Sequence, residues 1–449
     1  MINYKKTQEL RPGTKKFKVL SINLNYHTMD EMKRILAISI SLGSLIFAEE
    51  ASYGISGNPG AVSVITGNGN LGNLIRIPQD SGFRIGGIWM GDYNDLLHGG
   101  TGAHHNRRWT GNSLLILDLY IDFKKAFQWP GASFGVEFLQ FNGQSTNADA
   151  GVVQGYNSLP GAPPLNRSEL YQLWFRQEFL GGKFAIRFGK TIPTYHFNNV
   201  SKPVPEANPL MAIPSVSGLI YTPIFVNTTL LGAIGGYYNS VYGIEATIAP
   251  TDKLYINLAV YDGNLARGVQ TGLQGPHFNG YYFSIGEIGY GWTAPNPGIF
   301  AVGGWYQSGK LEAGTQSEQG TGGVYAFGSQ ALWRKKSSKG NLGDLSGFFQ
   351  FGWNASSTLE MNLYFGTGLT AFHIIPKRPN DSFGVGLAWS KLNHYLFKRH
   401  SELMLQAYYQ AQVYGSLYFQ PVFSYIPNPG ADPLHSNVCA LSGRLTLLF

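Results

Sequence analysis

The sequence predicts an all-β fold, a transmembrane antiparallel up-and-down β-barrel of about 16 strands. Three observations predict it: a composition rich in glycine and aromatic residues, apolar residues at every second position, and a last strand that ends on an aromatic residue. Glycine accounts for 58 of 449 residues and aromatic residues for 14%. Charged residues make up only 13%, against about 25% in soluble domains. After residue 48 no apolar run approaches the ~20 residues that a membrane-spanning helix needs.

The N-terminal region has the pattern of an export signal. Lys33 and Arg34 precede the apolar run 35–48, which ends in a small residue before two glutamates. A basic start, a short apolar core and a small residue are typical of a cleaved signal peptide, and the run is too short to span a bilayer. We expect residues 32–48 to be that signal and residues 1–31 to be an extension from a misplaced start site. Residues 49–80 are predicted to be a Gly- and Asn-rich lead-in or short plug, and residues 81–449 the barrel.

Charge argues against nucleic-acid binding once the signal is removed. The first 48 residues hold eight of the 33 Lys and Arg and three of the 26 Asp and Glu, so the remainder has a net charge of +2. Such a balance provides no basic footprint for nucleic acid. Cys439 is the single cysteine, which excludes a disulfide framework and a cysteine-only metal cage. We expect it to lie in the last strand.

Period-two alternation predicts the strands. In the segment 254–261, apolar Leu254, Ile256, Leu258 and Val260 alternate with Tyr255, Asn257, Ala259 and Tyr261. This is the pattern of a strand with lipid on one side. The segments 115–122, 184–189 and 359–366 alternate in the same way. Aromatic residues at strand ends predict interfacial girdles; they are Trp89, Tyr120, Trp305, Trp353 and Tyr425.

Connections and the C-terminus support a barrel over a soluble β-sandwich, which would also alternate but would not explain the low charge or the aromatic strand ends. Short polar turns alternate with long tracts such as 142–167 and 192–217, as in bacterial barrels. The residues from 81 onward give about 23 per strand and connection, which suits sixteen strands around a water-filled lumen. Leu445, Leu447 and Phe449 alternate with residues of the other face. A terminal strand ending at Phe449 is the feature expected to engage the outer-membrane assembly machinery.

Two segments resemble motifs of nucleotide-binding sites, but the residues around them do not fit those sites. Gly67, Gly69 and Gly72 match a dinucleotide fingerprint, but Pro78 follows without any helical period. The segment 189–191 ends like a phosphate loop, but Phe184 stands where the leading glycine belongs.

A histidine cluster has a similarly ordinary explanation. His98, His104 and His105 lie in a Gly-rich loop without a carboxylate at helical spacing, which is typical of solvated histidines. No H-E-x-x-H motif occurs. The sequence therefore predicts no enzyme, no cofactor and no metal.

The predicted lumen wall carries the remaining polar residues. Counting along 171–179 places Tyr171, Leu173, Phe175, Gln177 and Phe179 outward and Gln172, Trp174, Arg176 and Glu178 inward. The predicted pore- and substrate-lining residues are Arg84, Asp118, Glu137, Trp174, Arg176, Glu178 and Arg187. Charges of both signs beside an exposed indole suit a neutral polyol, since a sugar ring lies on the indole while its hydroxyls bond Arg and carboxylate groups. Alternatively, these charges only solvate a nonspecific pore.

Three segments carry a family resemblance. The segment 83–92 (FRIGGIWMGD) resembles the first barrel strand of the carbohydrate-selective porins of the OprB type. The segment 184–190 (FAIRFGK), and the segment 417–430 (LYFQPVFSYIPNPG) that leads to Arg444, are similar to the same family. The resemblance implies a sixteen-stranded, monomeric or trimeric channel whose inward loops form a constriction that prefers sugars. The sequence departs from the family at 193–195 and in the proline-rich segment 200–214, where a constricting loop is expected.

These observations together predict an outer-membrane diffusion channel for carbohydrates and other small neutral solutes, acting by passive or facilitated diffusion. Its expected partners are small carbohydrates, the lipid bilayer of the outer membrane, the assembly machinery and further copies in a homotrimer. The alternatives are a general porin, or a structural or surface-binding barrel without sugar selectivity. A transporter for apolar solutes is disfavoured because Arg176, Glu178 and Glu360 are predicted to point inward.

Overall fold

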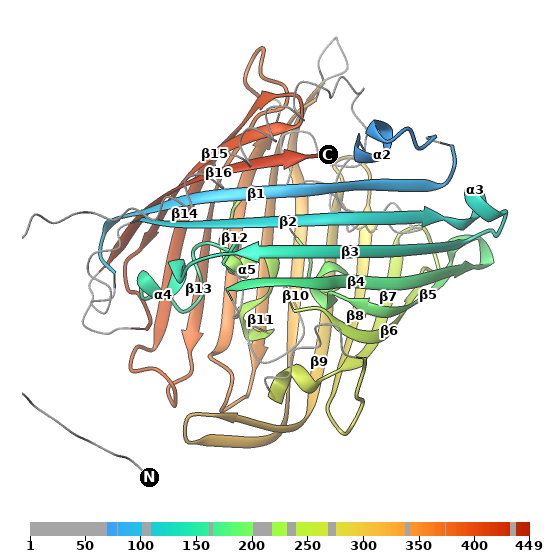
Figure 1. The fold of residues 1–449 in the computed structure, drawn as a ribbon. Coiled ribbons are helices and arrows are strands. Elements are labelled where there is room, and N and C mark those ends of the chain that lie inside the picture. The colour runs from blue at the N-terminus through green and yellow to red at the C-terminus, as the bar shows by residue number, and fades with distance from the viewer. Residues whose placement is uncertain are drawn as a thin grey trace, which may run out of the picture. The chain divides into compact units, whose positions relative to one another are not determined.

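The computed structural model describes residues 70–78, 80–100, 109–160, 165–200, 218–230, 239–267, 275–336, 342–372, 374–431 and 437–449. These residues form a closed barrel of sixteen antiparallel strands, which confirms the predicted fold class (Figure 1). Each strand pairs with its neighbours in chain order, and β1 pairs with β16. The predicted extension and signal peptide (1–48) and the lead-in as far as residue 69 lie outside the described residues.

The strands have the following bounds. They are β1 Phe83–His98, β2 Trp109–Asp122, β3 Ala132–Asn142, β4 Asn166–Phe179, β5 Phe184–Thr191, β6 Val241–Ile248, β7 Leu254–Asp262, β8 Tyr282–Trp292, β9 Gly298–Ala313, β10 Gln316–Lys336, β11 Leu342–Asn354, β12 Met361–Phe372, β13 Ser382–Leu392, β14 Ser401–Tyr414, β15 Leu417–Ile426 and β16 Val438–Leu448.

The helices are short and lie in the connections. They are α2 Asn70–Leu74, α3 Phe123–Phe127, α4 Thr146–Asp149 and α5 Thr222–Phe225, with 3-10 turns at Leu180–Gly182, Pro193–Tyr195, Thr228–Leu230 and Asn264–Arg267. Among the described residues, no helix has the length and apolar character needed to cross a membrane.

Alternating side chains give the barrel an apolar outer face and a polar or aromatic inner face. In β7, Leu258 and Val260 are exposed on the outside, whereas Tyr255 and Tyr261 are buried inside. Cys439 lies in β16, as predicted. An apolar outer face suits the hydrocarbon of a bilayer, because every backbone group of a closed barrel is paired between strands.

Two strands change phase where the sequence pattern predicts none. Tyr171 is fully buried in the interior, so its predicted outward position is wrong. The register between β3 and β4 shifts between Glu137 and Phe138, and Tyr171 is the extra residue on β4. A second shift, between β12 and β13, accompanies the burial of Met361, which the pattern also places outside. A bulge inserts one unpaired residue and thereby reverses the face of the residues before it.

The predicted girdle is correct for only part of its members. Trp353 is 46% exposed on the outer face. Trp305 is buried and contacts Phe283, and Tyr120 lies beside Arg84 on the inner face. Tyr120 is close to the end of β2, whereas Trp305 lies in the middle of β9. An aromatic residue in the alternating pattern therefore does not by itself distinguish a membrane interface from a lumen wall.

A buried ion pair joins the two strands that close the barrel. Asp92 of β1 and Arg444 of β16 are direct partners in register, and the Arg444 Nη2 atom lies 3.0 Å from the Asp92 Oδ2 atom. Asn157, from the connection between β3 and β4, donates to the same carboxylate at 2.8 Å and accepts from Arg444 at 2.8 Å. The junction of β1 and β16, which we call the seam, is therefore held by a bond between the two strands and by bonds to a loop inside the barrel.

Replacing Arg444 with methionine should lower the free energy of unfolding by about 3–5 kcal/mol, because Asp92 would remain buried without its cation. The measurement is urea unfolding in lipid vesicles, followed by the electrophoretic shift between folded and unfolded barrel. The matched control is Lys310→Met, which breaks an ion pair with Glu312 in which the two side chains are 49% and 63% exposed and should cost less than about 1 kcal/mol. Equal losses for the two variants would contradict the importance of the seam.

Candidate functional site

Two long connections run inside the barrel. We call residues 143–165 the β3–β4 loop and residues 192–240 the β5–β6 loop; parts of both are described. Within the β5–β6 loop, the Asn198 amide donates to Glu287 of β8 at 2.7 Å and the Gly218 amide to Tyr408 of β14 at 2.9 Å. Asn227 donates to a carbonyl of β11 at 2.9 Å. Because these partners lie on widely separated strands, the β5–β6 loop crosses the lumen.

The two loops are also bonded to each other. The Ser158 amide donates to the Ile220 carbonyl at 2.7 Å, and the Thr222 amide donates to the Gly155 carbonyl at 2.9 Å. Two backbone hydrogen bonds of this kind form a short bridge between segments more than sixty positions apart in the chain. The loops therefore form one body inside the barrel.

Buried carboxylates on the wall hold this body in place. Glu402 of β14 accepts from the amides of Val153 and Gln154 at 3.0 and 2.9 Å, and from the amide of Gly430. Glu287 accepts from the Asn198 amide and from two wall tyrosine hydroxyls at 2.8 and 2.9 Å. A carboxylate that accepts backbone N–H groups makes charge-assisted bonds, which are stronger than neutral ones.

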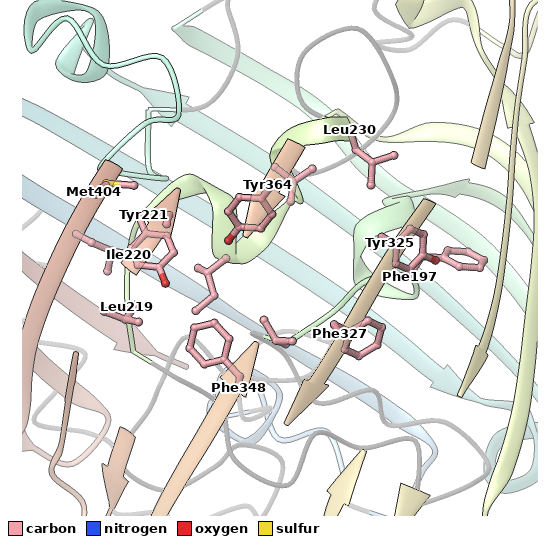
Figure 2. Packing of buried hydrophobic residues seen from close by; sticks show 14 of the residues in the cluster. Phe197, Leu219, Ile220, Tyr221, Leu230, Tyr325, Phe327, Phe348, Tyr364 and Met404 are labelled. Carbon is pink, nitrogen blue, oxygen red and sulfur yellow. The ribbon is translucent and has the colours of Figure 1, made fainter. Parts of the chain in front are cut away.

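Apolar packing adds to these bonds on the side of β7–β16. Figure 2 shows Leu219, Ile220 and Tyr221 of the β5–β6 loop beside wall residues, and Phe197 beside Tyr325. Burial raises the pKa of the Tyr221 hydroxyl. Burial, and next the charge of Asp92, raises the pKa of Tyr156. Both loop hydroxyls therefore stay neutral. The wall members labelled in the figure are Tyr325, Phe327, Phe348, Tyr364 and Met404.

The opposite wall, β1–β6, carries the predicted charged residues. Asp118, Glu137 and Gln172 are neighbours in register across β2, β3 and β4. Gln172 donates to Glu137 at 2.6 Å. The Arg84 guanidinium lies over the ring of Tyr120, 5.6 Å from its centroid. This part of the inner face thus carries an arginine as well as two carboxylates, and Asp118 and Glu137 lie directly opposite each other.

Two ion pairs continue the charged wall. Arg176 pairs with Glu178 on β4, with side chains 11% and 29% exposed. Arg187 of β5 pairs with Glu245 of β6, and both side chains are buried. Glu245 also accepts from the hydroxyls of Thr191 and Tyr261, each at 2.7 Å. The Arg176–Glu178 pair is therefore the more accessible of the two.

Trp174 does not form the exposed platform that the sequence predicts. Its side chain is on the inner face but only 5% exposed. Its partner in register is Gly135, where an added Cβ atom would lie 2.4 Å from the indole. The Arg187 guanidinium lies 5.4 Å from the ring centroid. The glycine leaves a hollow that the indole fills, as aromatic rings do beside glycines in sheets.

The residues that the sequence pattern predicts for the lumen lie together on the wall formed by β1–β6. The pattern did not identify the wall carboxylates that accept hydrogen bonds from loop amides. Glu287 and Glu402 each lie at an inward strand position and are buried. An acidic residue inside a period-two apolar pattern was the available signal. Their partners lie in loops tens to hundreds of positions away, so spacing alone could not identify them.

The glycine motif and the histidine cluster are each described only in part. Gly72 belongs to α2 beside β1, while Gly67 and Gly69 lie outside the described residues. His98 ends β1, and His104 and His105 are likewise outside them. Within the described residues, no group of three His, Cys, Asp or Glu side chains could hold a metal ion.

The family model "Carbohydrate-selective porin, OprB family" matches residues 115–449. The chain belongs to this family. With its closed sixteen-stranded barrel, it is an outer-membrane porin, and the end with the long loops faces the exterior. No curated protein sequence matches the chain.

Solved structures show the same fold. The high-pH structure of Pseudomonas putida OprB has a TM-score of 0.71 at 16% identity, and the match covers 89% of this chain and 100% of that one. The low-pH structure of the same protein has a TM-score of 0.53 at 14% identity, and the match covers 85% of this chain and 96% of that one. The structure of Salmonella typhi OmpF in complex with daunomycin has a TM-score of 0.50 at 10% identity, and the match covers 83% of this chain and 99% of that one. At these identities the likeness concerns the fold alone.

Replacing Glu402 with alanine should release the β3–β4 loop of this porin, because two amides of that loop would lose their acceptor, at a cost of about 1–3 kcal/mol for a buried one. Single-channel recordings in planar bilayers should then show a larger and noisier current than the unmodified channel. Glu312→Ala is the control, since Glu312 is 63% exposed and pairs with Lys310 of the same strand, β9. An unchanged current in Glu402→Ala would show that this anchor does not hold the loop.

Proposed function

We propose that this porin admits small neutral carbohydrates by passive diffusion between the charged wall and the two loops, and that it leaves them chemically unchanged. The observation that carries the proposal is the accessible Arg176–Glu178 pair on a wall of mixed charge, which faces a lumen narrowed by anchored loops. The lining residues that we propose are Arg84, Asp118, Glu137, Trp174, Arg176, Glu178 and Arg187.

Paired charges suit a neutral solute better than an ion. Arg176 and Glu178 cancel at a distance, and the field of each is screened beyond roughly 8–10 Å at physiological salt. At close range, a guanidinium donates and a carboxylate accepts, so sugar hydroxyls can exchange water for both. Half-buried Tyr120, beside Arg84, replaces Trp174 as the ring on which a sugar face can lie.

The same proposal includes the assembly of the barrel. The backbone of Phe449 continues the ladder between β16 and β1, because its amide donates to Gly87 at 3.0 Å and its carbonyl accepts from Gly87 at 2.7 Å. We propose that the assembly machinery engages this terminal strand and that the finished barrel associates as a homotrimer.

A monosaccharide added at high concentration should reduce the ion current by occupying the narrow part of the channel. The double substitution Arg176→Ala with Glu178→Ala should raise the half-blocking concentration about tenfold, because hydrogen bonds to charged groups contribute about 1.5–3 kcal/mol. The matched control is Lys310→Ala with Glu312→Ala, an exposed pair with the same spacing on β9, and it should leave the block unchanged.

Liposome swelling provides the companion measurement for this prediction. Monosaccharides should enter faster than zwitterions of similar mass. A current that does not respond to sugar, together with equal swelling rates for both solutes, would remove the carbohydrate preference and leave a general porin.

A further inference from the structure

The connection between β13 and β14 presents a cluster of basic side chains at the exterior end of the barrel. Residues 391–400 contain three Lys or Arg and two His, and no Asp or Glu occurs anywhere in 382–401. Lys391, His394, Lys398 and His400 are exposed. We call these four residues the basic rim. Because β13 runs toward the exterior end, the basic rim lies at the outer surface of the membrane.

The basic rim is held on a rigid turn. The Leu392 amide donates to the His400 carbonyl at 2.9 Å, which closes the loop and places its two ends side by side. Asn393 is buried at the centre, where its side chain donates to the Leu359 carbonyl at 2.8 Å and accepts from the Tyr395 amide at 3.0 Å. Preorganised charges lose less conformational entropy on binding than charges on a free loop.

The basic rim is continuous with the lipid-facing surface. The outward positions of β13 are Phe383, Val385, Leu387 and Trp389, and Lys391 is the next position on that face. Beyond it, the ring of Tyr395 is 54% exposed and lies 3.9 Å, centroid to centroid, from His394. An apolar strand that leads to an aromatic residue and then to lysine follows the order of a bilayer, from acyl chains through the interface to headgroups.

We propose that the basic rim binds the phosphate groups of a phosphorylated lipid in the outer leaflet, while the acyl chains of that lipid lie along the outer face of β13. Charge complementarity selects the headgroup, because lysine ammonium groups bind phosphate as point charges. Clustered basic residues beside a membrane each add about a fivefold preference for anionic lipid. This site is on the outside of the barrel and does not depend on which solute crosses the lumen.

The test uses the full chain purified in detergent and bis-phosphorylated lipid A as the probe, with binding measured by native mass spectrometry. Lys391→Gln with Lys398→Gln should weaken binding about 30-fold, since two lysine contacts are lost. Lys124→Gln with Lys125→Gln is the matched control: it removes two exposed lysines from α3, at the opposite end of the barrel, and should change the affinity less than about twofold. Sugar block of the current should be the same in all three proteins.

Two further arms identify the source of the phosphate and need no substitution. Lipid A from which the phosphates have been removed should bind the unmodified porin far more weakly than the phosphorylated form. Inorganic pyrophosphate alone should bind weakly, because it lacks the acyl chains. Equal losses in the two double variants, or equal binding of the two lipids, would overturn the site. Pyrophosphate that binds as tightly as lipid A would overturn its assignment to a membrane lipid.

Discussion

A sixteen-stranded barrel is too wide for its own side chains to fill, and this constraint organises the rest of the structure. Inward polar groups must either meet water or find partners, because a buried unpaired charge is costly. On the side of β7–β16 the partners come from loops: Glu287 receives the Asn198 amide, and Glu402 receives the amides of Val153 and Gln154. Glu402 depends on connections for these bonds, whereas Glu287 also accepts from two wall tyrosine hydroxyls.

The same constraint explains why the two sides of the lumen differ. The side that the loops cover is rich in tyrosine and phenylalanine, whose rings pack against Leu219 and Tyr221 (Figure 2). The opposite side keeps ion pairs such as Arg176 with Glu178, which satisfy each other without a loop. A path with charged hydrogen-bonding groups on one wall and fixed loops on the other combines a defined width with partners for hydroxyl groups.

How much of this could be predicted depended on whether a feature is local in the sequence. Alternation in β7 and in the terminal strand predicted strands, and the length of the chain after residue 80 predicted sixteen of them. Alternation along β5 predicted the inner position of Arg187. Local pattern could not predict that Gly135, on a neighbouring strand, makes room for Trp174, or that a bulge turns Tyr171 inward. The pairing of Asp92 with Arg444 depends on barrel closure between the first and last strands. The distance between the two residues along the sequence does not predict it.

Hydrogen exchange of the porin in lipid nanodiscs tests most directly whether the two loops form one anchored body. The amides of Ser158 and Thr222 bridge the loops by donating to Ile220 and Gly155, so they should exchange as slowly as paired strand amides. The amides of the turn at residues 314–315, between β9 and β10, provide the fast reference. If Ser158 and Thr222 exchange as fast as that turn, the loops do not hold each other inside the lumen and the account fails.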